Sequence, residues 1–166
     1  MTNTQQPEVL GVDIGGVVIV RTDDDDDTSF FGDRYLETAA ITGVFDALAR
    51  LTAERFGPNV HFVSKCGAEV EHKTRDWLAH HRMFERTGIP PENLHFCLRR
   101  DQKAPIAARL GLTHFVDDRL DVLKYLETVK TRILFDPVEA EVARQRHLLD
   151  EVTRVTGWAD VTALLL

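Results

Sequence analysis

The chain has 166 residues, of which 43% are hydrophobic and 28% charged, and these values are typical of a soluble globular domain that can bury a core. Its formal net charge of −7 argues against broad binding to nucleic acids or anionic membranes, which needs a basic face. Its two cysteines, Cys66 and Cys97, imply no disulfide framework and fit a reducing compartment.

The N-terminal third of the chain begins with a buried strand and continues into a polar loop. Residues 1–8 are polar and lack the pattern of a signal peptide, so we expect a cytoplasmic protein without a membrane partner. The β-branched run 9–20 predicts a strand that ends in a tight turn. Residues 21–38 predict a loop or small flap, and they include five consecutive aspartates at 23–27.

Strands and helices alternate in the rest of the chain. Hydrophobic spacing predicts helices over residues 44–56, 68–86, 103–110, 120–126, 138–149 and 158–166. It predicts short strands over residues 60–63, 94–98, 113–116 and 132–135. This alternation indicates an α/β fold with a Rossmann-like, doubly wound parallel sheet in three α/β/α layers. We expect one domain over residues 1–166, without a cap domain.

Three predicted strands end on polar side chains. We expect Asp13 at the end of the first strand, Ser64 at the end of the second, and Asp117 and Asp118 at the end of a later one. The carboxyl ends of parallel strands share one edge of a sheet, and ligands bind at that edge in open α/β folds. Lys103 stands at the predicted start of a helix. The sequence therefore predicts a polar site at this edge.

Four segments in order resemble the motifs of the haloacid-dehalogenase-like hydrolase superfamily. They cover residues 12–18, 60–64, 103–111 and 115–120, and the resemblance spans about residues 9 to 126. It implies a Mg²⁺-dependent phosphohydrolase that cleaves a phosphate ester through a phospho-aspartate intermediate. The implied substrate is a phosphorylated small molecule or macromolecule.

The resemblance also implies roles for individual residues. Asp13 is the nucleophile, and Ser64 and Lys103 complete the catalytic set. The phosphate-binding set comprises Gly15, Gly16, Ser64 and Lys103. The Mg²⁺ site comprises Asp13, Gly15, Asp117 and Asp118, with Asp118 favoured over Asp117 as a direct ligand and Asp121 as a weaker candidate for an outer neighbour.

Plainer interpretations of the same residues remain open at this point. Ser64 is also suited to cap a helix, and Lys103 to be a solvated lysine at a helix start. Asp117 either lies beside the metal or holds Lys103. Asp117 and Asp118 also fit the first turn of the next helix, where the helix dipole favours anions.

Gly15 departs from the motif of active phosphatases in this superfamily, which commonly carry a second aspartate there. That aspartate serves as the general acid and base, a contribution typically of ~10²–10⁴-fold. The alternative is therefore a non-catalytic phosphate- or protein-binding module that lost turnover at Gly15. A dehalogenase is less favoured, because those enzymes generally have a cap. By analogy, a capless site suits a large phosphorylated substrate, or closure by a second copy in a homo-oligomer.

Overall fold

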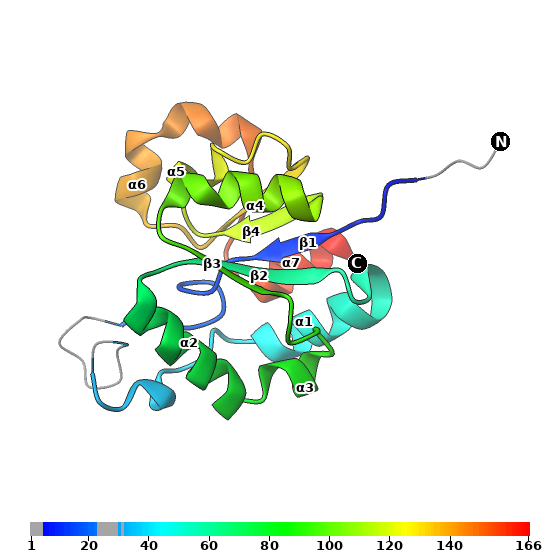
Figure 1. Cartoon of the computed structure of the whole chain (residues 1–166). Coiled ribbons are helices and arrows are strands. Elements are labelled where there is room, and N and C mark those ends of the chain that lie inside the picture. Colours follow the sequence, from blue (N-terminus) through cyan, green and yellow to red (C-terminus); the bar gives the residue numbers. More distant parts are fainter. Residues whose placement is uncertain (1–4, 23–29, 31) are drawn as a thin grey trace.

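The centre of the protein is a six-stranded sheet in which every neighbouring pair of strands is parallel (Figure 1). The structure is a computed structural model that describes residues 5–22, 30 and 32–166. The strand order is β3-β2-β1-β4-β5-β6. The strands are β1 (Leu10–Val12), β2 (Val60–Lys65), β3 (Leu94–Cys97), β4 (His114–Asp117), β5 (Thr131–Phe135) and β6 (Thr153–Val155).

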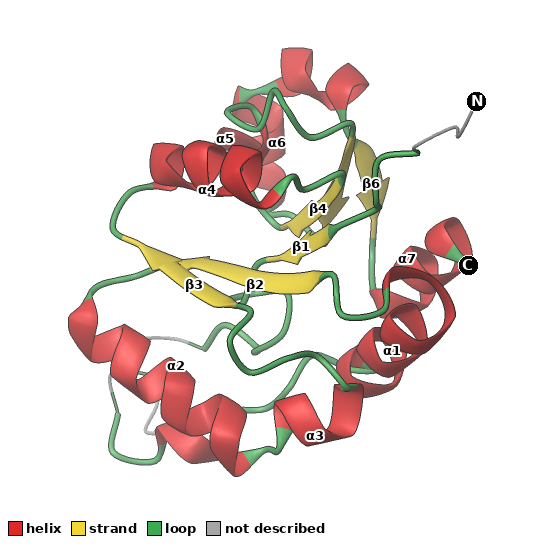
Figure 2. Ribbon diagram, turned by 45° about the vertical axis from the view of Figure 1, so that its right-hand side comes forward, coloured by secondary structure: helices red, strands yellow, loops and turns green. Residues whose placement is uncertain are grey.

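Helices cover both faces of this sheet (Figure 2). One face is covered by α1 (Val44–Leu51), α2 (Ala68–His80), α3 (Met83–Thr87) and α7 (Trp158–Leu165). The other is covered by α4 (Lys103–Leu110), α5 (Leu120–Leu123) and α6 (Glu139–Arg144). Successive strand residues point to opposite faces of the sheet. Phe62 therefore packs in the core on the α1 side, and Val63 in the core on the α4 side. The three-layer, Rossmann-like α/β fold predicted from the sequence is confirmed.

The order in which the chain adds strands to the sheet reverses beside β1. The chain runs outward from β1 through β2 to β3, and then returns to place β4 on the other side of β1. The gap between the connections that leave β1 and β4 is the switch point, where folds of this kind bind ligands. The fold thus marks the carboxyl ends of β1 and β4 as the place for a site.

The first strand is shorter than the hydrophobic run that predicts it. Only Leu10–Val12 is strand, and the N–H of Asp13 makes one further bond to the Val116 carbonyl at 2.9 Å. The chain then folds back on itself, because the Ile14 carbonyl accepts the N–H groups of both Val18 and Ile19 at 2.8 and 3.1 Å. The second half of the run is a buried loop, whose apolar residues belong to the core rather than to the strand.

Two expected helices differ in the structure, and the structure adds one strand. The helix predicted over 68–86 is two helices, because Arg82 adopts the left-handed conformation (φ 55°) between them. The helix predicted over 138–149 ends at Arg144, and a 3₁₀ segment, Arg146–Glu151, follows it. Strand β6 was not predicted at all.

The segment between β2 and α4 carries α2, α3 and β3, one helix more than expected. Both helices contribute to the core beneath the sheet, so this segment forms no separate layer. The aspartates at 23–27, and with them most of the expected flap, lie outside the described residues. Within the described part of the chain, no helix has the length and apolar character needed to cross a membrane.

Candidate functional site

The predicted site residues meet in one cleft at the carboxyl edge of the sheet. Asp13 directly follows β1, Ser64 lies near the end of β2, and Asp117 and Asp118 stand at the end of β4. The cleft has a volume of about 370 Å³, within the usual range for small-ligand sites. Its lining includes six of the seven predicted site residues, Asp13, Gly15, Ser64, Lys103, Asp117 and Asp118.

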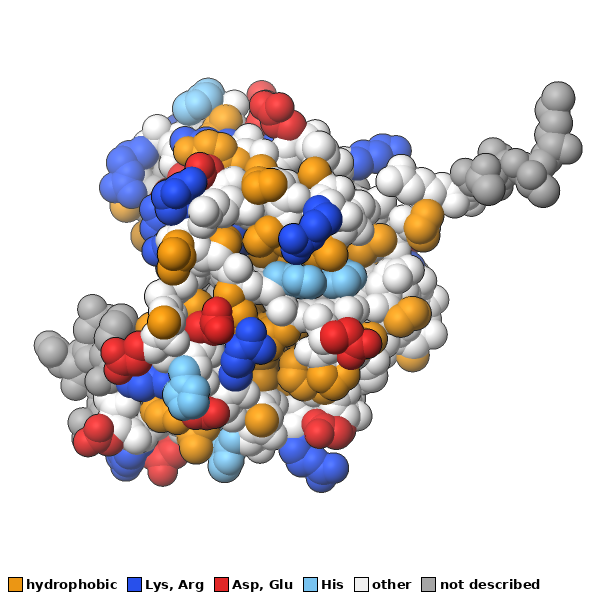
Figure 3. All heavy atoms as spheres, viewed as in Figure 1, with side chains coloured by type: hydrophobic (Ala, Val, Ile, Leu, Met, Phe, Trp, Pro, Cys, Tyr) orange, Lys and Arg blue, Asp and Glu red, His pale blue; other side chains and the backbone are white. Residues whose placement is uncertain are grey.

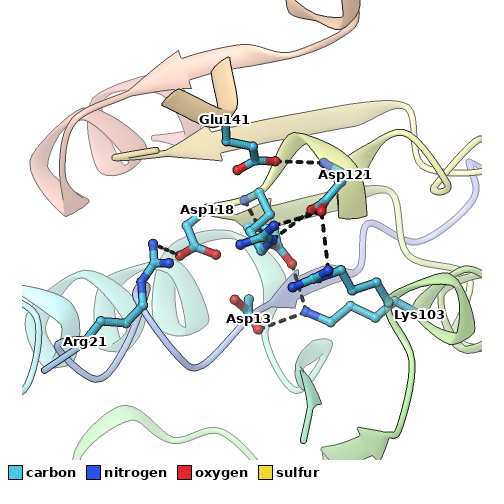
Figure 4. A network of polar contacts seen from close by, with 9 residues as sticks. Asp13, Arg21, Lys103, Asp118, Asp121 and Glu141 are labelled. Atoms are coloured by element: carbon cyan, nitrogen blue, oxygen red, sulfur yellow. Dashed lines mark hydrogen bonds and ion pairs between the residues drawn. The ribbon is translucent and has the colours of Figure 1, made fainter. Parts of the chain in front are cut away.

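Lys103 is the central cation of this site. It is the first residue of α4, yet its side chain is only 2% exposed, so the solvated-lysine interpretation is wrong. Its Nζ donates to Oδ1 of Asp13 at 2.9 Å and to Oδ2 of Asp117 at 2.8 Å (Figure 4). Burial opposes the charge, but the attraction of Asp117 and Asp13 outweighs it and raises the pKa of Lys103 above its usual range. Lys103 is therefore held as an ammonium between two carboxylates.

Asp117 holds Lys103 in place and is itself completely buried. Its Oδ1 accepts the backbone N–H of Arg119 at 3.0 Å, so both of its oxygens have partners. Burial, followed by repulsion from Asp13, raises the pKa of Asp117. Because α5 starts only at Leu120, Asp117 and Asp118 lie before the helix, and the interpretation that they form its first turn is wrong.

Asp118 is the carboxylate that most lacks a partner. Its Oδ2 is in ion-pair contact with the Arg21 guanidinium, but it receives no well-aligned hydrogen bond from the described residues. The Asp118 side chain is 3% exposed and that of Arg21 45% exposed, so the arginine reaches in from the rim (Figure 4). Burial, then repulsion from Asp13 and Asp117, raises the pKa of Asp118. Arg21 lies in a polar segment without periodicity, and sequence reasoning missed it.

The three aspartates form a group that fits a divalent cation. One oxygen from each of Asp13, Asp117 and Asp118 lies within 4.8 Å of the others. When all three carboxylates are ionised, they face two cations, Lys103 and Arg21, which leaves one negative charge in excess. Hard oxygen ligands and a surplus of negative charge suit Mg²⁺. The poorly satisfied Oδ2 of Asp118 is the oxygen that such an ion would serve best.

The loop after Asp13 owes its shape to Gly16 rather than to Gly15. Gly16 has φ +79°, and a Cβ there would collide with the carboxylate of Asp118. Gly16 thus lets the backbone pass beneath the Asp118–Arg21 pair, although it does not line the cleft. Gly15 is exposed at the cleft and has an ordinary φ, and a Cβ there would meet nothing within 4 Å. Position 15 therefore has room for a side chain.

Two residues of the cleft lining have backbone N–H groups without a backbone acceptor in the described chain. The loop is closed by hydrogen bonds from the N–H groups of residues 16–19, whereas neither Ile14 nor Gly15 donates to a backbone carbonyl of the described chain. Both residues line the cleft. Successive N–H groups of this kind can bind an anion such as a phosphate oxygen. Trp158 stabilises the loop from below, because its indole N–H donates to the Val17 carbonyl at 2.8 Å.

Ser64 and Cys66 line the β2 side of the cleft. Ser64 does not cap α2, since the N-cap residue of that helix is Gly67, so the capping interpretation is wrong. Burial and nearby Glu71 raise the pKa of the Cys66 thiol to about 11, which keeps it protonated and a poor nucleophile at neutral pH. The cleft therefore offers carboxylates rather than a thiolate as potential nucleophiles.

A second polar network supports the β4 side of the site (Figure 4). Arg119 donates two hydrogen bonds to Asp121, each at 2.8 Å, and the Asp121 N–H donates to buried Glu141 at 3.0 Å. Asp121, expected as an outer neighbour of the metal, is not one of the three clustered carboxylates and instead binds Arg119. Sequence reasoning gave no role to Arg119, although it lies within the fourth motif, or to Glu141, which lies in a predicted helix outside the motifs.

Comparison of the chain with protein-family models gives no match, and a search of curated proteins gives none either.

Proposed function

We propose that the protein is a Mg²⁺-dependent phosphohydrolase of the haloacid-dehalogenase-like type, which cleaves a phosphate ester through a phospho-aspartate at Asp13. The observation that carries this proposal is the meeting of Asp13, Lys103, Asp117 and Asp118 in one cleft at the switch point of the sheet. The order of the sequence motifs supports it independently of the geometry.

Asp13 is well presented for attack on phosphorus. Lys103 binds its Oδ1, which fixes the carboxylate and leaves Oδ2 for bond formation. Oδ2 attacks the phosphorus, the bond from phosphorus to the ester oxygen breaks, and the departing alkoxide takes a proton from water. A second water then attacks the phosphorus of the acyl phosphate and loses its proton to solvent. This step releases inorganic phosphate and restores the Asp13 carboxylate.

The rest of the cleft supplies positive charge and hydrogen bonds for the phosphoryl oxygens. Lys103 provides a fixed ammonium, Ser64 a hydroxyl, and Ile14 and Gly15 backbone N–H groups. Such fixed donors are the main source of catalysis in phosphoryl transfer. Mg²⁺ bound by Asp13 and Asp118, with Asp117 beside them, would neutralise the negative charge of the phosphate.

The experiment measures hydrolysis of p-nitrophenyl phosphate with Mg²⁺ by wild type, Asp13→Asn and a control, Asp46→Asn, whose exposed carboxylate lies on α1. We expect Asp13→Asn to lose turnover while it stays folded, and Asp46→Asn to keep the wild-type rate. Equal activity of Asp13→Asn and wild type would show that the phospho-aspartate mechanism is wrong.

One observation favours a second candidate, a phosphate- or protein-binding module without turnover. Gly15 stands at the cleft where an acid would donate to the leaving group, and it has no side chain to do so. Phosphate binding by wild type, measured calorimetrically, together with no hydrolysis of any tested ester would establish this alternative.

A further inference from the structure

A second, shallower pocket lies beside the main cleft at the same edge of the sheet. The two share Lys65, the last residue of β2, and Arg100, which follows β3. The remaining lining residues of the second pocket come from the segment after β3 and from the end of α5: Leu98, Arg99, Asp101, Asp121, Lys124 and Tyr125. A molecule held in the main cleft could extend into the second pocket without a break.

This second pocket carries a surplus of positive charge in a protein whose net charge is −7. Four cations and two carboxylates line it, which leaves two positive charges in excess. Asp101 pairs with Arg99 at 3.2 Å, and Asp121 lies 3.5 Å from Arg100 but is already bound by Arg119. Figure 3 shows basic side chains gathered over the α5 and α6 corner of this face (upper left).

Two of the four cations are uncommitted. Neither Lys65 nor Lys124 has a carboxylate within ion-pair distance among the residues that the structure describes, and both are exposed. Lys124 instead lies over the ring of Tyr125, at 5.0 Å from its centroid. Free ammonium groups beside a cleft that is proposed to hold one phosphate are suited to bind a further anion.

The wall formed by residues 98–102 is held rigidly. The side-chain carbonyl of Gln102 accepts the N–H groups of both Leu98 and Arg99 at 2.9 Å, and the Cys97 thiol donates to the Arg99 carbonyl at 3.4 Å. The same wall exposes 69% of Leu98, and Tyr125, which lines the same pocket, is 42% exposed. The pocket thus combines fixed cations with apolar surface that an organic group can cover.

We propose that this pocket is a second anion subsite, and that the substrate is a small phosphate ester that carries a second phosphate group. The inference rests on the proposed function for the reaction at the first phosphate. The second phosphate binds Lys124, Lys65 and Arg99, and the carbon skeleton between the two phosphates crosses the rim at Arg100.

The test measures binding and hydrolysis for two matched pairs, so that the shape of one organic group does not decide the result. The pairs are fructose 6-phosphate with fructose 1,6-bisphosphate, and adenosine 5′-monophosphate with adenosine 3′,5′-bisphosphate. Binding with Mg²⁺ present is measured calorimetrically on Asp13→Asn, which removes turnover. We expect at least one bisphosphate to bind about tenfold more tightly than its monophosphate, and this preference to shrink at high salt.

The variant Arg99→Gln/Lys124→Gln changes cations that line only the second pocket. It should remove the preference for the bisphosphate and leave monophosphate binding unchanged. The control Lys130→Gln removes one exposed charge just before β5, at the opposite edge of the sheet, and should keep the preference. No preference in either pair, or a preference that survives the double variant, would overturn the subsite.

Failure of the subsite and failure of the proposed function give different results. Hydrolysis of p-nitrophenyl phosphate without any preference for a bisphosphate refutes the subsite alone. A preference that depends on Arg99 and Lys124, without hydrolysis of any ester, refutes the phosphohydrolase and leaves the subsite. The absence of both results refutes both.

Discussion

Two adjoining surfaces at the carboxyl edge of the sheet differ in whether their charged side chains are buried and paired. In the main cleft, Asp13, Asp117 and Lys103 are buried and bonded to one another. In the second pocket, Lys65 and Lys124 are exposed and have no ion-pair partner in the described chain. Burial makes charges depend on one another, because an unpaired charge in the interior is costly, whereas water screens an exposed one. Substitutions in the two places should therefore differ greatly in their effect on stability.

The largest expected effect is that of Lys103→Met, which leaves Asp13 and Asp117 without their shared cation. Breaking a buried ion pair by removing one partner lowers the free energy of unfolding by about 3–5 kcal/mol. Lys124→Met, in the second pocket, should change it by less than about 0.5 kcal/mol. Urea unfolding of both variants without Mg²⁺ measures the difference.

A second substitution, in a residue that binds Lys103, adds a further test of this network. Lys103→Met/Asp117→Asn removes the cation together with one of the carboxylates that it neutralises, so it should recover part of the lost stability. Equal stability of Lys103→Met and wild type would contradict the buried network.

The next effect concerns an exposed position of the main cleft. Gly15 is exposed in the cleft, and its backbone accepts any residue, so Gly15→Asp should fold normally. The new carboxylate can donate a proton to the leaving group, and hydrolysis of alkyl phosphates should rise by up to ~10²–10⁴-fold. p-Nitrophenyl phosphate should gain much less, because its leaving group departs without a proton. The ratio of kcat/KM for the two ester types measures this, and an equal gain for both would contradict the role of a missing acid.

The sequence could indicate the edge at which the site lies, but not how its charges are paired. Strands that the sequence predicts to end on Asp13, Ser64 and Asp117 indicate a shared edge, since parallel strands present the same end there. The burial of Lys103 depends on contacts 14 and 90 residues away along the chain, which no local pattern encodes.

The fold was predictable for the same reason. The elements that the sequence did not predict correctly are explained by features of single residues or short segments. Thr153 and Arg154 in β6 are exposed, so the strand has too little hydrophobic pattern to be recognised. The spacing of apolar residues continues across Arg82, and only the backbone conformation there reveals that the helix is broken.

Arg21 joins the two kinds of environment, because its half-exposed side chain meets the buried carboxylate of Asp118. It places a positive charge where a divalent cation would bind. Arg21→Gln should therefore bind Mg²⁺ about fivefold more tightly, which corresponds to about 1 kcal/mol of binding free energy. Without Mg²⁺ the variant should melt at a lower temperature than wild type, because Asp118 loses its cation.

Thermal melts with Mg²⁺ and with EDTA, and calorimetric titration with Mg²⁺, measure both effects. Arg34→Gln, which removes an exposed arginine paired with Glu37, is the control and should behave as wild type. Asp118→Ala should abolish the stabilisation by Mg²⁺. Weaker Mg²⁺ binding by Arg21→Gln would show that the arginine supports the metal site instead of competing for it.

The smallest effect is expected where burial is only partial. His61 and His95 lie side by side on β2 and β3, with Nδ1 of one 3.0 Å from Nε2 of the other. Burial, together with neighbouring His95 for the first and Arg109 for the second, lowers the pKa of both below 6.5. The unfolded chain therefore binds protons at a higher pH than the folded protein does. The stability contributed by the neutral rings is complete above about pH 6.5 and is lost as the pH falls toward their folded pKa values.

Urea unfolding between pH 7.5 and 5.5 measures this contribution as the difference between wild type and variants, because the raised pKa values of Asp117 and Asp118 act in the opposite direction but are common to both. As the pH falls over this range, wild type should lose stability relative to His95→Gln, and more relative to His61→Gln/His95→Gln, because each substitution removes a group that takes up a proton on unfolding. If the difference in the free energy of unfolding between wild type and each variant stays constant over this range, the histidine pair does not supply this pH dependence. Protonation of these partly buried rings would then not be coupled to the stability of the protein. This would contrast with the cleft, where the charge of Lys103 depends on its buried partners.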